Sequence, residues 1–210
     1  MHTPEDLCHG KLITLEGLDG AGKSSILQQL PSRLTMCKVC VKPCGERQSP
    51  LSELLANSEL KTMTPLLKTY LFAADRAWTY EQDCLPALKA GSLVLWDRYV
   101  DSALAYRAAE LRLAKNPVDM DFVEQINSPF RPPDLTLYIE ISPRTSAQRT
   151  GGTASSTPYR TDFLEMVSAE YHHLAHKRRY VVVGGERPLE LVARDVAFEI
   201  KARFAELFSA

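Results

Sequence analysis

The segment Gly17-Leu18-Asp19-Gly20-Ala21-Gly22-Lys23-Ser24 decides the fold of this chain, and it follows the apolar run Lys11-Leu12-Ile13-Thr14-Leu15-Glu16. The segment matches the phosphate-binding pattern G-x-x-x-x-G-K-[ST] at every fixed position. The run before it is typical of a short buried strand, and Ser25-Ile26-Leu27-Gln28-Gln29-Leu30 after it is typical of the start of a helix. The sequence therefore predicts a phosphate-binding loop between a strand and a helix.

The residue types in this loop have a physical reason. Glycines let the backbone turn its N–H groups toward phosphate oxygens, and the start of the following helix adds a positive dipole. Lys23 would reach the β- and γ-phosphates, and the Ser24 hydroxyl would bind Mg²⁺. A glycine-rich turn without a ligand is the alternative, which the combination of strand, loop and helix disfavours. We expect a bound nucleotide to contact Gly17, Leu18, Asp19, Gly20, Ala21, Gly22, Lys23, Ser24 and Ser25.

Length and composition limit the class of protein. A chain of 210 residues suits one domain, and its formal net charge of −1 argues against nucleic acid or an anionic membrane as the main partner. No apolar run approaches the length of a membrane span, and the N-terminus has no signal-peptide pattern. We expect a disordered tail over residues 1–10 and a single domain over 11–210, in the cytoplasm.

Five cysteines, an odd number without secretory context, favour free thiols. The spacing of Cys37, Cys40 and Cys44 is only faintly like that of a metal site, because Cys37 and Cys40 would point to opposite faces of a strand. The histidines of the polar segment 172–176 are expected to be solvated. Neither group is expected to bind a metal.

Further along the chain, apolar runs alternate with helical patterns. This alternation predicts an α/β fold of the P-loop NTPase type, a parallel sheet of about five strands with helices on both faces. Pro31 should kink the first helix or end it early, and Pro43 should stop the second strand. The expected strands span residues 11–16, 38–42, 92–97, 134–141 and 179–183.

Two further features suit phosphoryl transfer. Asp97 ends an apolar strand, and a carboxylate at the carboxyl end of a strand beside a phosphate-binding loop is well placed for Mg²⁺. The small polar segment 150–158 lies between Arg149 and Arg160. We expect a mobile lid over about 145–160 that brings both arginines to the phosphates, with an ordinary surface loop as the alternative.

Several segments together resemble the thymidylate kinase family, the nucleoside-monophosphate kinases that phosphorylate dTMP with ATP. The resemblance runs from Leu12 to about Phe208. It rests on the pieces Glu16–Ser24, Leu71–Arg76, Asp97–Tyr99 with Ser102 and Ala105-Tyr106, and Pro133–Tyr138. The loop carries Gly20-Ala21 where one branch of the family has an arginine, so the chain looks like the bacterial-type branch, whose catalytic arginines come from the lid.

The resemblance also implies roles for individual residues. Phe72 would stack on thymine, Arg76 would hydrogen-bond the base, and Tyr106 would lie beneath the deoxyribose and disfavour a 2′-hydroxyl. It implies ATP as phosphoryl donor, Mg²⁺ as cofactor and a homodimer. The implied catalytic residues are Lys23, Arg98, Arg149 and Arg160, and the implied metal ligands are Ser24 and Asp97. The implied substrate residues are Asp19, Lys42, Phe72, Arg76, Arg98, Ser102, Tyr106 and Arg107.

The chain departs from the family pattern mainly on the acceptor side. Val41-Lys42-Pro43-Cys44-Gly45 stands where the family has Arg-Glu-Pro-Gly-Gly, so Lys42 or Arg47 would have to replace an arginine, and Arg107 stands where a glutamine is usual. In the lid, Thr161 follows Arg160 in place of the usual acid. Two activities therefore remain open, namely dTMP phosphorylation and a related P-loop kinase activity on another nucleotide or nucleoside. An inactive nucleotide-binding regulator is disfavoured, because the expected catalytic residues are present.

Overall fold

The computed structural model describes residues 10–35, 41–45, 49–56, 63–113, 120–151, 161–178 and 180–208. Several expectations fall outside these ranges. They concern the N-terminal tail, Cys37 and Cys40, Arg47, and the lid beyond Gly151, which includes Arg160. For Lys42 and Pro43 only the backbone is described.

Five parallel strands form one sheet in the order β2-β3-β1-β4-β5. This confirms the predicted α/β fold with a parallel sheet of five strands. Because all the strands run the same way, their carboxyl ends meet at one edge of the sheet. The strands are β1 (Lys11–Glu16), β2 (Val41–Gly45), β3 (Leu93–Asp97), β4 (Leu135–Glu140) and β5 (Val181–Gly184).

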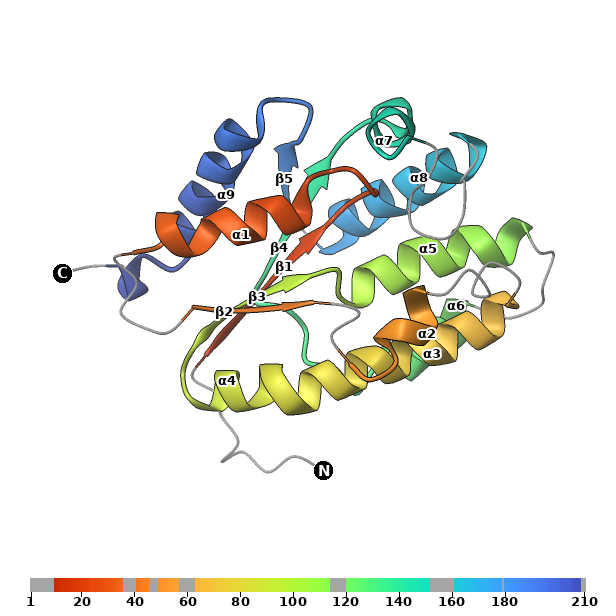
Figure 1. Ribbon diagram of the computed structural model, residues 1–210, viewed down its shortest axis with the longest axis horizontal. Coiled ribbons are helices and arrows are strands. Elements are labelled where there is room, and N and C mark those ends of the chain that lie inside the picture. The colour runs from red at the N-terminus through yellow and green to blue at the C-terminus, as the bar shows by residue number, and fades with distance from the viewer. Residues whose placement is uncertain are drawn as a thin grey trace.

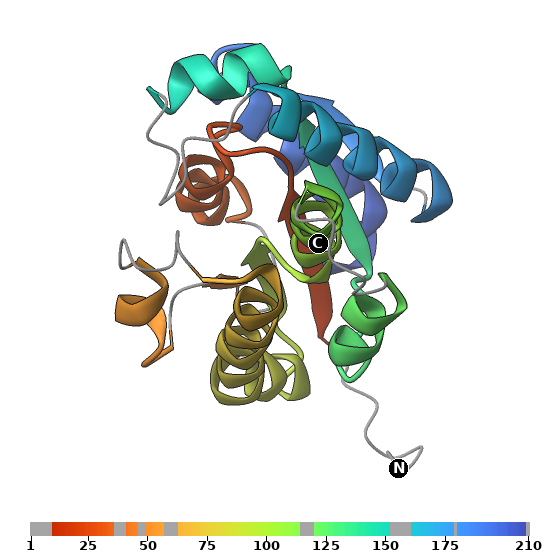
Figure 2. The same cartoon turned by 90° about the vertical axis from the view of Figure 1, so that its right-hand side faces the viewer.

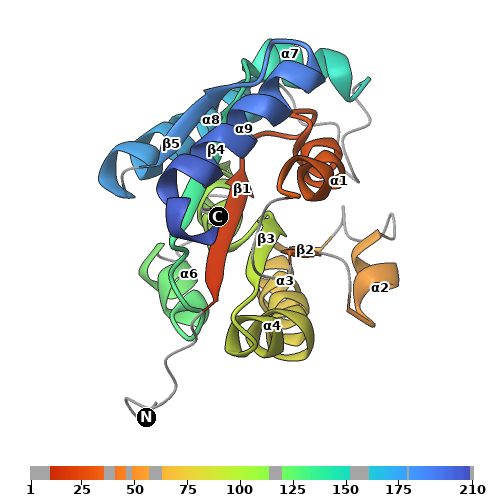
Figure 3. The same ribbon diagram turned by 90° about the vertical axis from the view of Figure 1, so that its left-hand side faces the viewer.

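Helices cover both faces of this sheet (Figure 1). The helices α1 and α9 lie next to each other on one side (Figure 3), and α8 runs alongside α5 on the other (Figure 2). The helices are α1 (Lys23–Arg33), α2 (Ser52–Ala56), α3 (Pro65–Thr79), α4 (Leu85–Lys89), α5 (Val100–Leu113), α6 (Met120–Asn127), α7 (Pro143–Arg149), α8 (Thr161–Arg178) and α9 (Leu189–Arg203), with a π-helical turn η2 (Tyr80–Cys84) and a 3₁₀ turn η3 (Ala205–Leu207).

Two groups of buried apolar side chains pack against the sheet. Leu12, Val94 and Trp96 pack with Cys84 and Leu88 in one group. The other group joins Ile13 and Leu95 to residues of α1, α5, α8 and α9. Trp96 is fully buried, as expected for a core residue, whereas Trp78 is almost half exposed on α3.

Two expectations that a proline ends its element are wrong. The helix α1 continues to Arg33, so Pro31 lies in its last turn, where the missing N–H removes only one late hydrogen bond. The second strand is described over Val41–Gly45 and includes Pro43, which was expected to stop it. Within the described ranges β2 lies at the edge of the sheet and pairs with β3 alone, and an edge strand tolerates a residue that cannot donate.

None of the described helices is both long enough and apolar enough to cross a membrane. The described residues also contain no group of three or more histidine, cysteine or acidic side chains that could hold a metal ion.

Gly17 lies where the chain leaves β1, next to β4. Any side chain at this position should destabilise the folded protein. The φ of Gly17 is 139°, and a Cβ added there would lie 2.4 Å from the carbonyl oxygen of Ile139. We expect Gly17→Ala to lower the free energy of unfolding by roughly 2 kcal/mol or more, because steric overlap adds to backbone strain. Urea denaturation of the purified variant measures this change.

The control is Gly91→Ala. Gly91 also has a positive φ, 78°, but a Cβ there would meet nothing within 4 Å. This variant reports backbone strain alone. Equal losses of stability in the two variants would contradict the role given to the contact with Ile139.

Candidate active site

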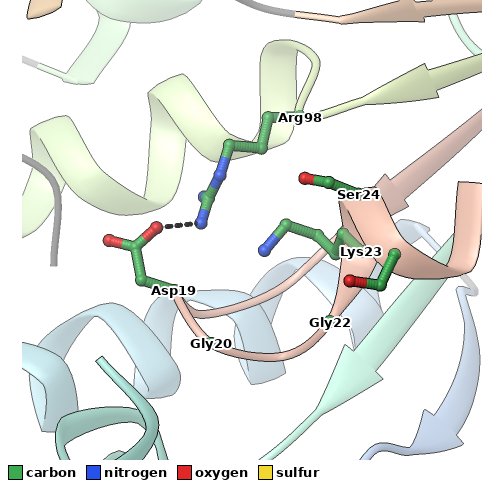
Figure 4. Close-up of a pocket in the computed structure, with 7 residues that line it drawn as sticks. Asp19, Gly20, Gly22, Lys23, Ser24 and Arg98 are labelled. Atoms are coloured by element: carbon green, nitrogen blue, oxygen red, sulfur yellow. Dashed lines mark hydrogen bonds and ion pairs between the residues drawn. The ribbon is translucent and has the colours of Figure 1, made fainter. Parts of the chain in front are cut away.

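The predicted phosphate-binding loop turns between β1 and α1 as the glycines require. Gly20 and Gly22 have φ values of 76° and 88°, in the left-handed region that glycine adopts at little cost, and Gly22 is the N-cap of α1. Leu18 and Ala21 are buried beneath the loop, so they can offer a ligand only their backbone. The loop borders a cavity of about 250 Å³ (Figure 4), lined by Asp19, Gly20, Gly22, Lys23, Ser24, Ser25 and Arg98.

Lys23, the first residue of α1, crosses the inside of the loop. Its Nζ donates to the carbonyl oxygens of Gly17 at 2.9 Å and Leu18 at 2.8 Å. Burial and, to a lesser extent, the nearby Arg98 charge lower the pKa of this ammonium to about 8, while Asp97 and Asp19 oppose the shift. Lys23 therefore remains mostly charged at pH 7 and carries its charge into the cavity.

Ser24 and Asp97 are brought together from α1 and the end of β3. The Ser24 hydroxyl donates to Oδ2 of Asp97 at 2.5 Å. The other carboxylate oxygen, Oδ1, is buried and has no hydrogen-bond partner among the residues that the structure describes. A hydroxyl and a free carboxylate oxygen are the hard oxygen ligands that Mg²⁺ prefers. These two residues therefore fit the predicted metal site.

Arg98 links the turn after β3 to the phosphate-binding loop. Its Nη2 forms an ion pair with Asp19, drawn as a dashed line in Figure 4. Its guanidinium carbon lies 5.2 Å from the centre of the Tyr106 ring, and Nη1 is 3.5 Å from Oγ of Ser102. The Tyr106 hydroxyl in turn accepts from the backbone N–H of Asp19 at 3.2 Å. Four predicted site residues from the loop, the turn and α5 thus form one connected group.

Arg149 lies at the end of α7, against the loop. Its Nη1 donates to the carbonyl oxygens of Gly20 at 3.2 Å and Gly185 at 3.0 Å. The arginine therefore connects the phosphate-binding loop to the segment between β5 and α9. Its catalytic role as a lid arginine stays a prediction, as does that of Arg160.

Phe72 and Arg76, the residues expected to bind the base, lie on α3 and do not line the loop cavity. Arg76 is fully buried, its Nη1 donates to Oδ1 of Asn127 at 2.6 Å, and its guanidinium lies 5.7 Å from the Phe130 ring. Asp75 is also buried and accepts from Ser49 at 2.5 Å. Neither side chain is exposed, so Asp75 and Arg76 do not form a solvated pair on the surface.

Phe72 and Arg107 contact each other across α3 and α5. The Arg107 guanidinium carbon lies 5.2 Å from the centre of the Phe72 ring. Arg107 also forms an ion pair with Glu110 at 2.8 Å, and Nζ of Lys68 is 3.6 Å from the same carboxylate. The arginine that departs from the family pattern is thus nearly buried beside the predicted base-stacking ring.

The structure adds Glu16 and Tyr171, which sequence reasoning did not single out as site residues. Glu16 is fully buried at the end of β1 and accepts from the backbone N–H of Tyr99 at 2.8 Å and from the hydroxyls of Ser102 and Tyr171. An acidic residue that ends an apolar strand beside the loop could have drawn attention to Glu16. No local pattern distinguishes Tyr171 within its mostly polar helix.

The parallel sheet carries this loop at its carboxyl edge. Asp97 at the end of β3 lies beside Ser24 of the loop, and Arg98 faces the cavity. Together these features define a P-loop phosphotransferase. The family model described as "Thymidylate kinase" matches residues 15–196. The chain therefore belongs to the thymidylate kinase family, which confirms the resemblance seen in the sequence.

Individual relatives agree with this assignment. A protein named thymidylate kinase from Limosilactobacillus reuteri is 32% identical, over 95% of this chain and 99% of its own. Two archaeal proteins named probable thymidylate kinase are also similar. The one from Pyrobaculum aerophilum is 31% identical over 90% of this chain and 95% of its own. The one from Methanococcoides burtonii is 33% identical over 89% and 94%.

The pairing of Ser24 with Asp97 predicts a defect specific to the metal. In Asp97→Asn the charged oxygen ligand is lost while the shape of the side chain is kept. We expect the gain in ATP affinity that Mg²⁺ provides to fall by roughly tenfold or more, with metal-free affinity little changed. Calorimetric titration of ATP with and without Mg²⁺ measures both quantities, with the exposed Asp121→Asn on α6 as control. A normal response to Mg²⁺ in Asp97→Asn would exclude Asp97 from the metal site.

Proposed function

We propose that this protein transfers the γ-phosphoryl group of ATP to the 5′-phosphate of dTMP, giving dTDP and ADP. The observation that carries the proposal is the gathering of Lys23, Ser24, Asp97 and Arg98 at the phosphate-binding loop in a chain of the thymidylate kinase family. Asp97 accepts from Ser24, and the other three residues line one cavity. Lys23, Ser24 and Asp97 belong to the donor side of such a site. Arg98 belongs with Asp19 to the acceptor side. The activity serves the synthesis of dTTP.

The transfer requires charge neutralisation and alignment more than covalent help from the protein. The loop N–H groups and Lys23 bind the donor phosphates, while Ser24 and Asp97 hold Mg²⁺. Mg²⁺, when bound, neutralises charge on the β- and γ-phosphate oxygens. Arg98, oriented by its ion pair with Asp19, binds the acceptor phosphate. The attacking oxygen belongs to a phosphate that is already ionised, so no general base is needed.

On the acceptor side, Phe72 stacks on thymine and Arg76 hydrogen-bonds the base. The contacts of Arg76 with Asn127 and Phe130 support this role because they hold a buried guanidinium in one orientation on the same helix as Phe72. Tyr106 excludes a 2′-hydroxyl. The proposed substrate residues are completed by Asp19, Lys42, Ser102 and Arg107, and the proposed lid cations are Arg149 and Arg160.

The test is a panel of acceptors. Purified protein with ATP and Mg²⁺ is given dTMP, dUMP, dCMP or thymidine, and ADP formation is followed in a coupled assay. We expect dTMP to have the highest kcat/KM. Preference for thymidine or for dCMP would overturn the proposed acceptor while leaving the P-loop kinase class in place.

Matched lysine variants complete this test. Lys23→Ala should lower kcat/KM for dTMP by ~10²–10³-fold, the usual loss when one charge-stabilising donor is removed from a transition state. Lys89→Ala, an exposed change at the end of α4, should have no effect. A kcat/KM near the wild-type value in Lys23→Ala would contradict the catalytic role given to Lys23.

We also propose that the enzyme acts as a homodimer in the cytoplasm. The proposal for the dimer rests on α3, where Leu67, Tyr70 and Trp78 are 45%, 50% and 47% exposed. With Ala74 between them, their spacing places them along one side of the helix. Large apolar side chains on one exposed helix face are typical of a surface that another protein chain covers.

This surface predicts a change of mass on mutation. Trp78→Glu places a charge on the α3 face, which should convert the dimer into a monomer at micromolar concentration because burying an unpaired charge is costly. Light scattering after size-exclusion chromatography measures the mass. Phe198→Glu, at a 66% exposed site on α9, is the control and should leave the dimer intact. A dimer that resists Trp78→Glu would place the interface elsewhere.

A further inference from the structure

Arg98 has an unusual backbone conformation for its residue type. Its φ is 60°, and it is the one non-glycine residue with a positive φ in the part of the chain that the structure describes. Side chains other than glycine enter this region only when surrounding contacts hold them there. The turn that carries the acceptor-side arginine therefore needs a fixed support.

The end of β1 provides that support through two consecutive hydrogen bonds. The N–H of Arg98 donates to the carbonyl oxygen of Leu15 at 3.1 Å, and the N–H of Tyr99 donates to Oε1 of Glu16 at 2.8 Å. The first bond continues the pairing of β3 with β1. The second uses a side chain, so the position of the turn depends on the Glu16 carboxyl group.

The other oxygen of Glu16 connects the turn to two helices. Oε2 accepts from the hydroxyl of Ser102 on α5 and from that of Tyr171 on α8 at 3.2 Å, and these two hydroxyls are 2.8 Å apart. Ser102 Oγ is also the atom that faces Nη1 of Arg98. One fully buried carboxyl group thus joins β1, the Arg98 turn, α5 and α8. The helix α8 begins at Thr161, directly after Arg160 in the sequence.

We propose that Glu16 is a positioning residue of the phosphoryl-transfer site, which in its ionised form holds the left-handed turn so that Arg98 faces Asp19 and the phosphate-binding loop. Through Tyr171 the same carboxylate fixes α8 to this turn. This inference depends on the proposed function only for the identity of the acceptor. Glu16 touches no nucleotide in this role and acts through Arg98.

The charges around Glu16 come from every element packed against it. Asp101 and Arg98 face it from α5 and its preceding turn, and Lys23 from α1. Tyrosines lie nearby as well. They are Tyr171 on α8, whose hydroxyl donates to Glu16, Tyr180 before β5, and Tyr138 on β4, the register partner of Glu16. Arg178 of α8 pairs with Asp101 at 2.7 Å and offsets part of that negative charge.

These surroundings bring the titration of Glu16 close to neutral pH. Burial and, to a lesser extent, the charge of Asp101 raise its pKa to about 7, while hydrogen bonds from Ser102 and Tyr99 and the charge of Arg98 oppose the rise. All three donors point at the carboxyl group. When it takes up a proton, one hydroxyl must turn and accept in place of donating. The supporting network therefore weakens as the pH falls through about 7, and with it the hold on Arg98.

The kinetic experiment compares pH profiles of kcat/KM for dTMP. The wild-type profile should fall below an inflection near pH 7. Glu16→Gln keeps the size of the side chain but cannot ionise, so its kcat/KM at pH 8 should drop at least tenfold and this inflection should disappear. Any inflection from the substrate phosphates remains in both profiles. Asp101→Asn is the control that removes the other buried carboxylate, and it should keep the inflection and move it to lower pH.

Tyr171→Phe provides a second, milder variant in case Glu16→Gln does not fold. It removes one donor to the ionised carboxylate, so the inflection should move to higher pH. An inflection that is unchanged in both Tyr171→Phe and Glu16→Gln would overturn the proposal. Loss of the inflection in Asp101→Asn alone would overturn it as well, because the titrating group would then be Asp101.

A measurement without nucleotide separates this inference from the proposed function. The Tyr99 amide donates directly to Glu16, so its proton chemical shift in NMR spectra should titrate near pH 7 in the wild type, at higher pH in Tyr171→Phe, and not at all in Glu16→Gln. A Tyr99 amide that does not titrate, or that titrates alike in all three proteins, would refute the role of Glu16. If the amide titrates as expected but dTMP is not phosphorylated, the proposed function fails and the positioning role stands.

Discussion

The parallel pairing of β1 with β3 is the constraint on which the site depends. This pairing places Leu15 opposite Asp97, so both strands end at the same level of the sheet. The phosphate-binding loop leaves one strand there and the Arg98 turn leaves the other. Ser24 therefore meets Asp97, and Asp19 meets Arg98, although 73 and 79 residues separate the partners of the two pairs in the sequence. A shift of one residue between these two strands would separate both pairs, because it would turn the side chains of the strand to the opposite face.

The site also depends on a balance of buried charge. Lys23 and Arg98 carry positive charge into a region that holds the carboxyl groups of Asp19, Asp97 and Glu16. Each cation has carboxylates nearby, which limits the cost of burying it before any phosphate arrives. Binding of nucleotide phosphates adds negative charge to the same region. The affinity of the site therefore depends on cations that already have protein partners, and on how easily those partners are exchanged for phosphate oxygens.

Much of this arrangement could be predicted from the sequence, because it follows from local patterns. The loop, the strands at 11–16 and 92–97 and the strand-end position of Asp97 need only an apolar run, fixed glycines and a carboxylate at a known offset. The end of the second strand was predicted too early because proline ends most strands, and the tolerance of Pro43 depends on its place at the sheet edge. Contacts such as Arg76 with Asn127, or Glu16 with Tyr171, join residues 51 and 155 positions apart. No local pattern contains them, since they depend on how α6 and α8 pack against the remainder of the chain.

The two edges of the sheet restrict how the protein can associate. The edge strand β2 contains Pro43, which has no N–H to offer, and the opposite edge, β5, is only four residues long. Proline and short length are both features that prevent a sheet from growing by the addition of a strand from another molecule. Molecules can then associate through their helical surfaces, where side chains rather than backbone hydrogen bonds make the contacts. An enzyme with such edges can reach a high concentration in a cell while its sheets remain separate from those of neighbouring copies.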